Sequence, residues 1–382
     1  MDCLSALARP LGLAALVLCV LLPAPLRAAE DFAFLPAVTF TEPASMQLLD
    51  ITRAGDRLVA VGERGVIILS DDDGASWRQA PVPVSVTLTA LHFPQPELGW
   101  AVGHSGTILH SNDGGESWSL QFDGYDANRQ YLAWAQERVR QLEDALAEAE
   151  AEGVEEADLG ELQYALEDAS FAVDDATDAI DVGPADPFLD VLFLDANNGF
   201  AVGAYGMLYR TDNGGSDWKI AIAGIDNAYR YHYYAMAAGA DGRLYLSGEA
   251  GLLYYSSDNG GSWERVEDLY DGSLFGIAAQ AGELYAYGLR GHVFRSTDGG
   301  VSWEEVGNAE RYSLYGGTRL ADGHVLMVGS GGLVLASTDG GGLRGWRHPS
   351  RSSLSSAVET AGGDILLVGM AGLLPLSEAD PL

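Results

Sequence analysis

One stretch decides the fold, because both of its halves recur along the chain: Gly103-His104-Ser105-Gly106-Thr107-Ile108-Leu109-His110-Ser111-Asn112-Asp113-Gly114-Gly115-Glu116-Ser117-Trp118. The first half is a Gly-x-x-Gly turn, followed by an alternating apolar run that ends in Ser or Thr. It occurs seven times, with first glycines at Gly62, Gly103, Gly203, Gly248, Gly288, Gly329 and Gly369. Apart from one step of 100 residues, the copies are 40 to 45 residues apart. A strand-forming repeat of this length indicates the blades of a β-propeller.

The second half, Ser/Thr-x-Asp-x-Gly-x-x-Trp, is typical of a tight hairpin turn. Serine and aspartate oxygens accept hydrogen bonds from turn amides, glycine allows a positive φ, and tryptophan returns the chain to the core. Six copies place their acid or amide at Asp72, Asp113, Asn213, Asp258, Asp298 and Asp339. We interpret these as structural residues, because turns spread around a rim keep their carboxylates apart and lack the ligand series of a calcium loop. Only the run Asp71-Asp72-Asp73 leaves a weak metal site open.

Composition and charge indicate where the protein is located and which classes of partner are excluded. The 382 residues include 55 acidic and 21 basic side chains, a formal net charge of −34. Such a surface repels nucleic acid and anionic lipid, so we expect neither as a partner. Residues 1–28 are typical of a secretory signal, with an apolar run over 11–22 and cleavage near Ala28. Cleavage predicts a soluble periplasmic protein without Cys3 and Cys19, and an uncleaved anchor is the alternative.

The repeat predicts an all-β fold, a seven-bladed propeller of four-stranded antiparallel blades with an inserted α-helical hairpin. The expected parts are residues 1–28 (signal), 29–123 (closing strand and blades one and two), 124–184 (insertion) and 185–382 (blades three to seven). Blade seven ends near Leu376 without a fourth strand, and a lone strand-like segment, Phe34–Phe40, precedes blade one. We therefore expect Phe34–Phe40 to close the ring as the outer strand of blade seven.

The order of strands assigns the turns to two faces. Since successive strands are antiparallel, the Gly-x-x-Gly turns and the blade-to-blade connections share one face, which we call the Gly-x-x-Gly face. The Asp-box turns, the Ser/Thr-x-Asp-x-Gly-x-x-Trp copies, lie on the opposite face.

The long step between blades two and three contains an insertion with helical periodicity. Apolar residues at alternating steps of three and four predict helices over Asp126–Glu152 and Val154–Val182, with a break at Gly153. These form an acidic antiparallel hairpin roughly 40 Å long at 1.5 Å per residue. Because it interrupts a blade-to-blade connection, we expect it to rise from the Gly-x-x-Gly face beside the channel mouth. The alternative is that it folds back and covers the disc.

Arginine and tyrosine gather at the blade starts and Gly-x-x-Gly turns, and this composition is typical of binding hot spots. The predicted partner-binding residues are Arg64, Tyr205, Tyr229, Arg230, Tyr231, Arg290, Arg311, Tyr312 and Arg351. The alternative is that the tyrosines pack between blades and the arginines pair with carboxylates. The seven histidines show no zinc-ligand spacing, and no phosphate-binding loop or nucleophile elbow is present. We expect no cofactor.

The exported chain with seven Gly-x-x-Gly strands and Asp-boxes resembles the photosystem II assembly and stability factor family, over about residues 31–123 and 185–382. The resemblance implies a non-enzymatic scaffold that binds membrane-protein subunits, with Arg230, Arg290, Arg311 and Arg351 in the place of the family's arginine patch. The hairpin and the acidity depart from the family. The hairpin and the acidity match better the similar propellers that accompany RND-type exporters. The expected partner is a membrane protein or its periplasmic domain, bound through the Gly-x-x-Gly face and the hairpin.

The competing class is a sialidase-like glycoside hydrolase. Sialidases share Asp-boxes on a six-bladed propeller and use an arginine triad, a tyrosine nucleophile and an acid. This chain has those residue types but lacks a Phe/Tyr-Arg-Ile-Pro segment near its start, and seven repeats argue against six blades. We therefore predict that the protein is not an enzyme.

Overall fold

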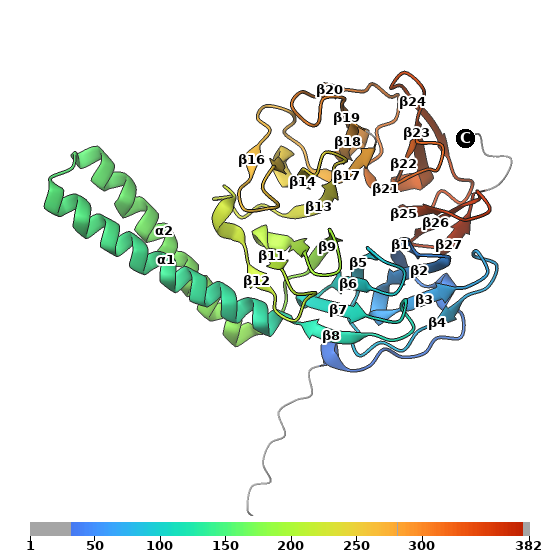
Figure 1. The fold of residues 1–382 in the computed structure, drawn as a ribbon, viewed down its shortest axis with the longest axis horizontal. Coiled ribbons are helices and arrows are strands. Elements are labelled where there is room, and N and C mark those ends of the chain that lie inside the picture. Colours follow the sequence, from blue (N-terminus) through green and yellow to red (C-terminus); the bar gives the residue numbers. More distant parts are fainter. Residues whose placement is uncertain (1–31, 281, 377–382) are drawn as a thin grey trace, which may run out of the picture. The chain divides into compact units, whose positions relative to one another are not determined.

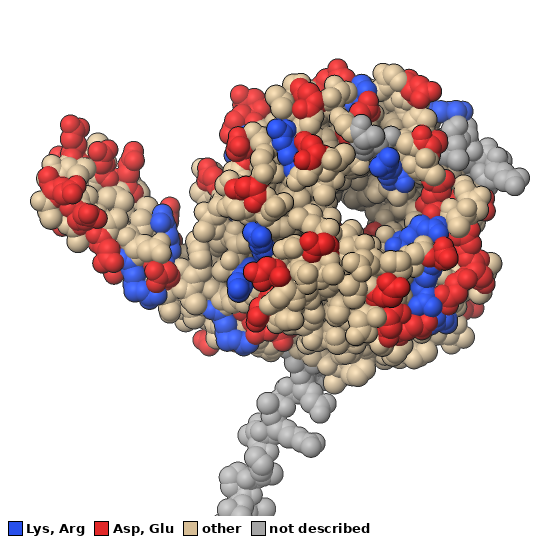
Figure 2. Space-filling model, in the orientation of Figure 1, with Lys and Arg blue, Asp and Glu red and all other residues tan. Residues whose placement is uncertain are grey.

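A ring of seven antiparallel sheets forms the body of the protein. The computed structural model describes residues 32–280 and 282–376, and the predicted signal peptide lies outside them. The described residues from Ala33 onward form one compact unit. Its sheets surround a central opening, and two long helices stand beside them (Figures 1 and 2). The predicted seven-bladed propeller with a helical hairpin is confirmed.

Each blade is a meander whose strands pair in sequence order. Blade one contains β1 (Leu48–Ala54), β2 (Arg57–Gly62), β3 (Ile67–Ser70) and β4 (Arg78–Gln79). Blade two contains β5 (Leu88–His92), β6 (Gly99–Gly103), β7 (Thr107–Ser111) and β8 (Ser119–Phe122). Blade three contains β9 (Phe188–Phe193), β10 (Gly199–Gly203), β11 (Leu208–Thr211) and β12 (Lys219–Ile220). Blade four contains β13 (Tyr233–Ala238), β14 (Leu244–Gly248), β15 (Leu253–Ser256) and β16 (Glu264–Arg265).

The remaining blades follow the same order, and the last one is shorter. Blade five contains β17 (Leu274–Gln280), β18 (Glu283–Gly288), β19 (Val293–Ser296) and β20 (Glu304–Glu305). Blade six contains β21 (Leu314–Arg319), β22 (Val325–Gly329), β23 (Leu333–Ser337) and β24 (Leu343–Arg347). Blade seven contains β25 (Leu354–Glu359), β26 (Ile365–Gly369) and β27 (Gly372–Pro375).

The core lies between the blades. Second strands such as β6 and β22 are buried along their whole length, because the two neighbouring blades cover both faces. Continuous apolar runs are typical of strands in that position. In one cluster, Val61 and Leu69 of blade one pack with Leu91 and Ala101 of blade two. Burial of apolar surface between blades therefore stabilises the ring.

Every inner strand carries a β-bulge near its start. The register between first and second strands shifts after the first residue, for example between Leu48 and Asp50. A bulge leaves one residue per blade outside the ladder. These bulge residues are Leu49, Thr89, Leu189, Tyr234, Phe275, Tyr315 and Ser355.

The N-terminal segment does not form the outer strand of blade seven. Blade seven has three strands, and residues 33–41 contain none. Instead, Ala37 N donates to Val82 O at 3.0 Å and Phe40 N donates to Gln79 Oε1 at 2.9 Å. The segment therefore follows the chain that leaves β4. A strand at this position would need the backbone amides of the segment to bond to blade seven. Pro36 has no amide hydrogen, and the Phe40 amide donates to the Gln79 side chain instead.

The ring is closed by side chains packed between blades seven and one. Phe40 packs against a cluster that includes Leu48 of β1 and Val368 of β26. On the Asp-box side, Ala361 N donates to Asp73 Oδ1 at 2.8 Å. Closure therefore uses apolar burial and single hydrogen bonds in place of a shared strand.

The insertion forms the predicted hairpin of α1 (Gly124–Glu152) and α2 (Glu156–Val182). Asp123 caps α1 by accepting from Asp126 N at 3.0 Å, and Gly153 ends it with a φ of 72°. Within the described residues, no helix combines the length and apolarity needed to cross a bilayer.

The direction of the hairpin differs from both expectations. It leaves from the Gly-x-x-Gly face, where Gly124 N donates to Ser105 O at 2.8 Å, but extends outward beyond blade three (Figure 1). The cause is Gln130, whose side chain donates to Trp218 O at 2.7 Å and accepts from Ile220 N at 2.9 Å. It binds the edge strand β12 and holds α1 at the rim, away from the channel mouth.

Two bulges are followed by an aspartate that links neighbouring inner strands. Asp50 Oδ2 accepts from Leu91 N at 3.0 Å, and Asp190 Oδ2 accepts from Met236 N at 2.7 Å. Burial raises the pKa of Asp50 to about 6 and that of Asp190 to about 7. At pH values between the ordinary pKa of an aspartate and these raised values, the folded protein therefore keeps protons on both carboxyls that an unfolded chain releases.

Asp190→Asn is expected to weaken the pH dependence of stability. The folded pKa of Asp190 lies above the ordinary value of 3.8, so the stability that protonation provides is lost as the pH rises toward and through about 7. Between about pH 5 and pH 8, the free energy of unfolding of the wild type should fall by about 2 kcal/mol more than that of Asp190→Asn. Urea denaturation at both pH values measures this. Asp212→Asn, at an exposed site, serves as the control. Identical pH dependence in Asp190→Asn and the wild type would contradict the prediction.

Candidate functional site

The Gly-x-x-Gly turns lie directly against the connections that lead into the inner strands. A Cβ on Gly62 would lie 2.0 Å from Gln47 O, and one on Gly65 would lie 2.2 Å from Val84 O. Gly65 also has a φ of +71°. Any side chain at either position would collide with backbone, so only glycine fits.

The residue before the second glycine has a left-handed backbone in six of the seven turns. These residues are Arg64, Ser105, Tyr205, Ala250, Arg290 and Gly331, with φ between 51° and 63°. This conformation costs about 1 kcal/mol or more for a residue with a side chain. Such strain clusters at functional sites. Here it occurs at three exposed residues of the predicted binding set, Arg64, Tyr205 and Arg290.

Four of the predicted binding residues meet at the junction of blades three and four. Arg230 Nε donates to Tyr205 O at 3.3 Å, and the Arg230 guanidinium lies 4.7 Å from the ring centre of Tyr131 in α1. Tyr229 is 82% exposed, and its ring centre lies 5.6 Å from that of Tyr231. This group therefore joins the Gly-x-x-Gly face to the base of the hairpin.

Three more predicted residues lie at the junction of blades five and six. Arg290 N donates to Ser313 Oγ at 3.3 Å, directly after the exposed residues Arg311 and Tyr312. The guanidinium of Arg347 covers the Tyr312 ring, 3.7 Å from its centre. Tyr312 therefore already binds a cation of its own chain on one ring face.

Arg64 in blade one and Arg351 between blades six and seven stand apart from both groups. The structure does not gather the nine predicted residues into one cluster. It distributes them around one face at the blade junctions.

Four arginines of this face lack an ion pair among residues 32–280 and 282–376, although the chain has many carboxylates. They are Arg64, Arg290, Arg311 and Arg351. By contrast, Arg57 near the Asp-box turns and Arg347 beside Tyr312 form ion pairs, and Arg230 lies 4.0 Å from Asp175. The alternative that the arginines pair internally therefore fails for these four. Their guanidinium groups are available for a carboxylate from outside.

An aromatic arc that the sequence analysis did not identify joins three neighbouring inner strands at the Gly-x-x-Gly end. It consists of Tyr234, Phe275 and Tyr315, the bulge residues of blades four, five and six. Their successive ring centres lie 5.0 and 5.7 Å apart, and Tyr315 is 42% exposed. Each directly follows the first residue of an inner strand. Aligning the repeats at that position would therefore have revealed three consecutive aromatic residues.

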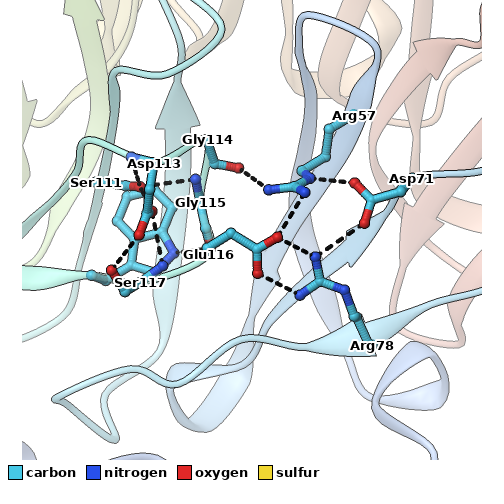
Figure 3. Close-up of polar contacts among 10 residues, drawn as sticks. Arg57, Asp71, Arg78, Ser111, Asp113, Gly114, Gly115, Glu116 and Ser117 are labelled. Atoms are coloured by element: carbon cyan, nitrogen blue, oxygen red, sulfur yellow. Dashed lines mark hydrogen bonds and ion pairs between the residues drawn. The ribbon is translucent and has the colours of Figure 1, made fainter.

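The Asp-box turns satisfy their own polar groups. In blade two, Gly115 N donates to Ser111 Oγ at 2.8 Å, and Ser111 Oγ and Ser117 N donate to Asp113 Oδ1 at 2.8 and 3.0 Å (Figure 3). Equivalent bonds occur at Asp72, Asn213, Asp258 and Asp298. The amide and hydroxyl of Ser262 lower the pKa of Asp258 to about 2. These oxygens are therefore engaged within their turns.

The sixth turn departs from this pattern. Asp339 is exposed and forms an ion pair with His324 Nε2 at 3.4 Å, and Ser337 Oγ accepts from Val325 N at 2.9 Å. The tryptophan comes two residues late, and β24 pairs with β23 over five residues. The longer ladder replaces the side-chain bonds of the other turns. Asp339 therefore contacts His324 in place of the groups of its own turn, and its structural role stays a prediction.

An ion-pair network joins the Asp-box turns of blades one and two. Arg57 Nη2 lies 2.7 Å from Glu116 Oε1, and Arg78 Nη2 lies 3.0 Å from Asp71 Oδ2 and 2.5 Å from Glu116 Oε1 (Figure 3). The hydrogen bond from Arg57 lowers the pKa of Asp71. Two guanidinium groups thus bind the first carboxylate of the acidic run. In the described part of the chain, no group of three His, Cys, Asp or Glu could hold a metal ion.

Comparisons with known proteins agree with the fold and the repeat. A family model described as Photosynthesis system II assembly factor YCF48 matches residues 69–133 and 170–362, about two thirds of the chain. Over 89 residues the chain is 33% identical to the Photosystem II assembly lipoprotein Ycf48 of Synechococcus sp. (strain CC9902). That alignment covers 23% of this chain and 26% of the relative, so it spans about a quarter of that protein.

Solved structures show the same architecture at low identity. The structure titled YCF48 bound to D1 peptide matches 91% of this chain and 100% of its own, with a TM-score of 0.60 and 15% identity. The WD40 β-propeller domain of Doa1 matches 88% of this chain and 93% of its own, with a TM-score of 0.56 and 11% identity. Likenesses at this identity show the fold alone.

The seven sheets, the Gly-x-x-Gly turns and the Asp-boxes define a seven-bladed Asp-box propeller. Within that class, the chain belongs to the YCF48 family of photosystem II assembly factors. The family match omits residues 134–169, most of the outer part of the hairpin.

Ser111→Ala is expected to destabilise the protein by about 1–2 kcal/mol, because the buried Gly115 amide loses its acceptor. Chemical denaturation monitored by tryptophan fluorescence measures the change. Ser119→Ala is the matched control, since its exposed hydroxyl donates only to His110 O at 3.3 Å. Equal stability of the two variants would show that the Asp-box hydroxyl does not support its turn.

Proposed function

We propose that the protein is a non-catalytic assembly factor, exported to the periplasm, that holds a segment of a membrane-protein partner on its Gly-x-x-Gly face. The observation that carries this proposal is a set of four arginines on that face of a YCF48-family propeller, none of which has an ion pair among the described residues. In a chain with a net charge of −34, arginines without an internal carboxylate are best explained by an external one.

The composition of the face indicates the kind of segment it holds. The arginines favour carboxylates of the partner, either side chains or a chain end. The aromatic arc offers stacked rings to an apolar side chain. An extended acidic segment with apolar residues fits both features. The similar structure of YCF48 bound to a D1 peptide supports a peptide ligand. We extend that mode of binding to this chain as part of the proposal.

We further propose an RND-type exporter as the membrane partner. Two features support a partner other than a photosystem subunit. The hairpin lies largely outside the family match, and the surface is strongly acidic. A rigid hairpin that extends beyond the rim suits a partner with a large periplasmic domain, because it adds a second contact area beside the Gly-x-x-Gly face.

The combined variant Arg290→Ala, Arg311→Ala and Arg351→Ala is expected to reduce partner recovery about tenfold or more, since each lost charge-assisted bond contributes about 1.5–3 kcal/mol. The measurement is affinity capture of tagged protein from host membranes, quantified by mass spectrometry. Arg265→Ala is the matched control, because this exposed arginine of β16 lies 3.7 Å from Glu267 on an outer strand. Recovery of the same membrane protein at wild-type level by the triple variant would contradict the proposal.

A further inference from the structure

A large groove separates the hairpin from the propeller near blades three and four. Its volume is about 740 Å³, within the range of ligand-binding pockets. On the hairpin side it is lined by small residues, among them Ala135, Ala169, Ala172 and Ala176. On the propeller side it is lined by Met207, Ile220, Ile222 and Ile225. Both walls are therefore mainly apolar.

Short side chains on one wall and a fixed base keep the groove open. Gln130 ties α1 to β12, and Tyr209 Oη donates to Ala127 O at 3.1 Å. Beyond this base, the alanines of the hairpin leave space that longer side chains would fill. Tyr131 and Trp134 stack with ring centres 5.8 Å apart and form one end of the apolar lining.

Carboxylates predominate among the charged groups that line the groove. The five acids are Glu137, Asp168, Asp175, Asp186 and Asp226. The basic residues are Arg138 and Arg230. Arg230 lies 4.0 Å from Asp175 and is also engaged by Tyr131 and Tyr205. The hairpin beyond the groove is also acidic, since residues 141–182 contain no lysine or arginine (Figure 2).

We propose that this groove binds a short amphipathic helix of the partner whose apolar face is flanked by lysine or arginine. Helices bind grooves through apolar anchors at i, i+3, i+4 and i+7, and cationic flanks complement the carboxylates of this groove. A second copy of the chain is a poor occupant, because its own acidic hairpin would be repelled. The inference rests on the proposed function only in assigning the helix to the membrane-protein partner.

The groove is continuous with the Gly-x-x-Gly face. Tyr205 and Arg230 line the groove and also belong to the binding residues of that face. A partner chain that leaves the groove therefore meets the face directly. The two sites differ in charge, because the face presents unpaired arginines and the groove presents carboxylates. They recognise a basic helix and an acidic segment of one partner, respectively.

A pair of synthetic peptides tests the groove directly. Each is a labelled helix of about 15 residues of leucine and alanine, one with four lysines on its polar face and the other with four glutamates. Fluorescence anisotropy with the full chain should show at least about tenfold tighter binding of the lysine peptide. Ala172→Trp, which fills the groove, should weaken binding about tenfold. Asp168→Asn combined with Asp175→Asn should weaken it several-fold without a change in fold.

The control is Glu152→Gln combined with Glu155→Gln, which removes the same number of charges at the free end of the hairpin and should leave affinity unchanged. Equal binding of the two peptides, or wild-type affinity in both groove variants, overturns the inference. Membrane capture by the Arg290, Arg311 and Arg351 variant is measured separately. Intact capture without peptide selectivity overturns the groove alone. Peptide selectivity with unchanged capture by the arginine variant overturns the proposed function alone.

Discussion

Close contact between backbones at each Gly-x-x-Gly turn is the constraint on which the rest of the structure depends. The contact is tightest at Gly251, where a Cβ would lie 1.8 Å from Tyr270 O. It joins the end of a second strand to the connection that enters the next blade. Because this junction is held rigidly, the left-handed residue beside it and the bulge residue after it occupy nearly the same place in each blade. The side chains on this face can therefore differ from blade to blade while the backbone geometry stays the same.

The two faces of the disc use charge in opposite ways. On the Asp-box face, carboxylates are bound within their turns or by arginines such as Arg57 and Arg78. On the Gly-x-x-Gly face, four arginines have no such partner among the described residues. In so acidic a chain, arginines left without an internal carboxylate are expected of a surface that binds a carboxylate from another molecule.

The hairpin changes the surface without changing the ring. It interrupts a connection between blades, and its contacts with the disc are made by a few residues near its base, among them Gln130 and Tyr131. A disc packed blade against blade tolerates such an insertion, because no core strand is displaced. The result is a family propeller that carries an apolar groove with a carboxylate rim.

Repeats and periodicities by themselves determined the number of blades, the order of strands, the two helices and the face that carries Arg64, Arg290, Arg311 and Arg351. These features depend on local patterns that recur with a fixed spacing. The N-terminal segment was predicted wrongly, because an apolar extended stretch reads the same whether it joins a ladder or, like Phe40, gives its amide to a side chain. Only the tertiary structure decided the aromatic arc, the groove and the direction of the hairpin. Tyr234, Phe275 and Tyr315 are about 40 residues apart in sequence and meet only because neighbouring blades pack against one another. Likewise, the bond between Gln130 and a strand 90 residues later sets the position of α1, and no local pattern encodes a contact at that separation.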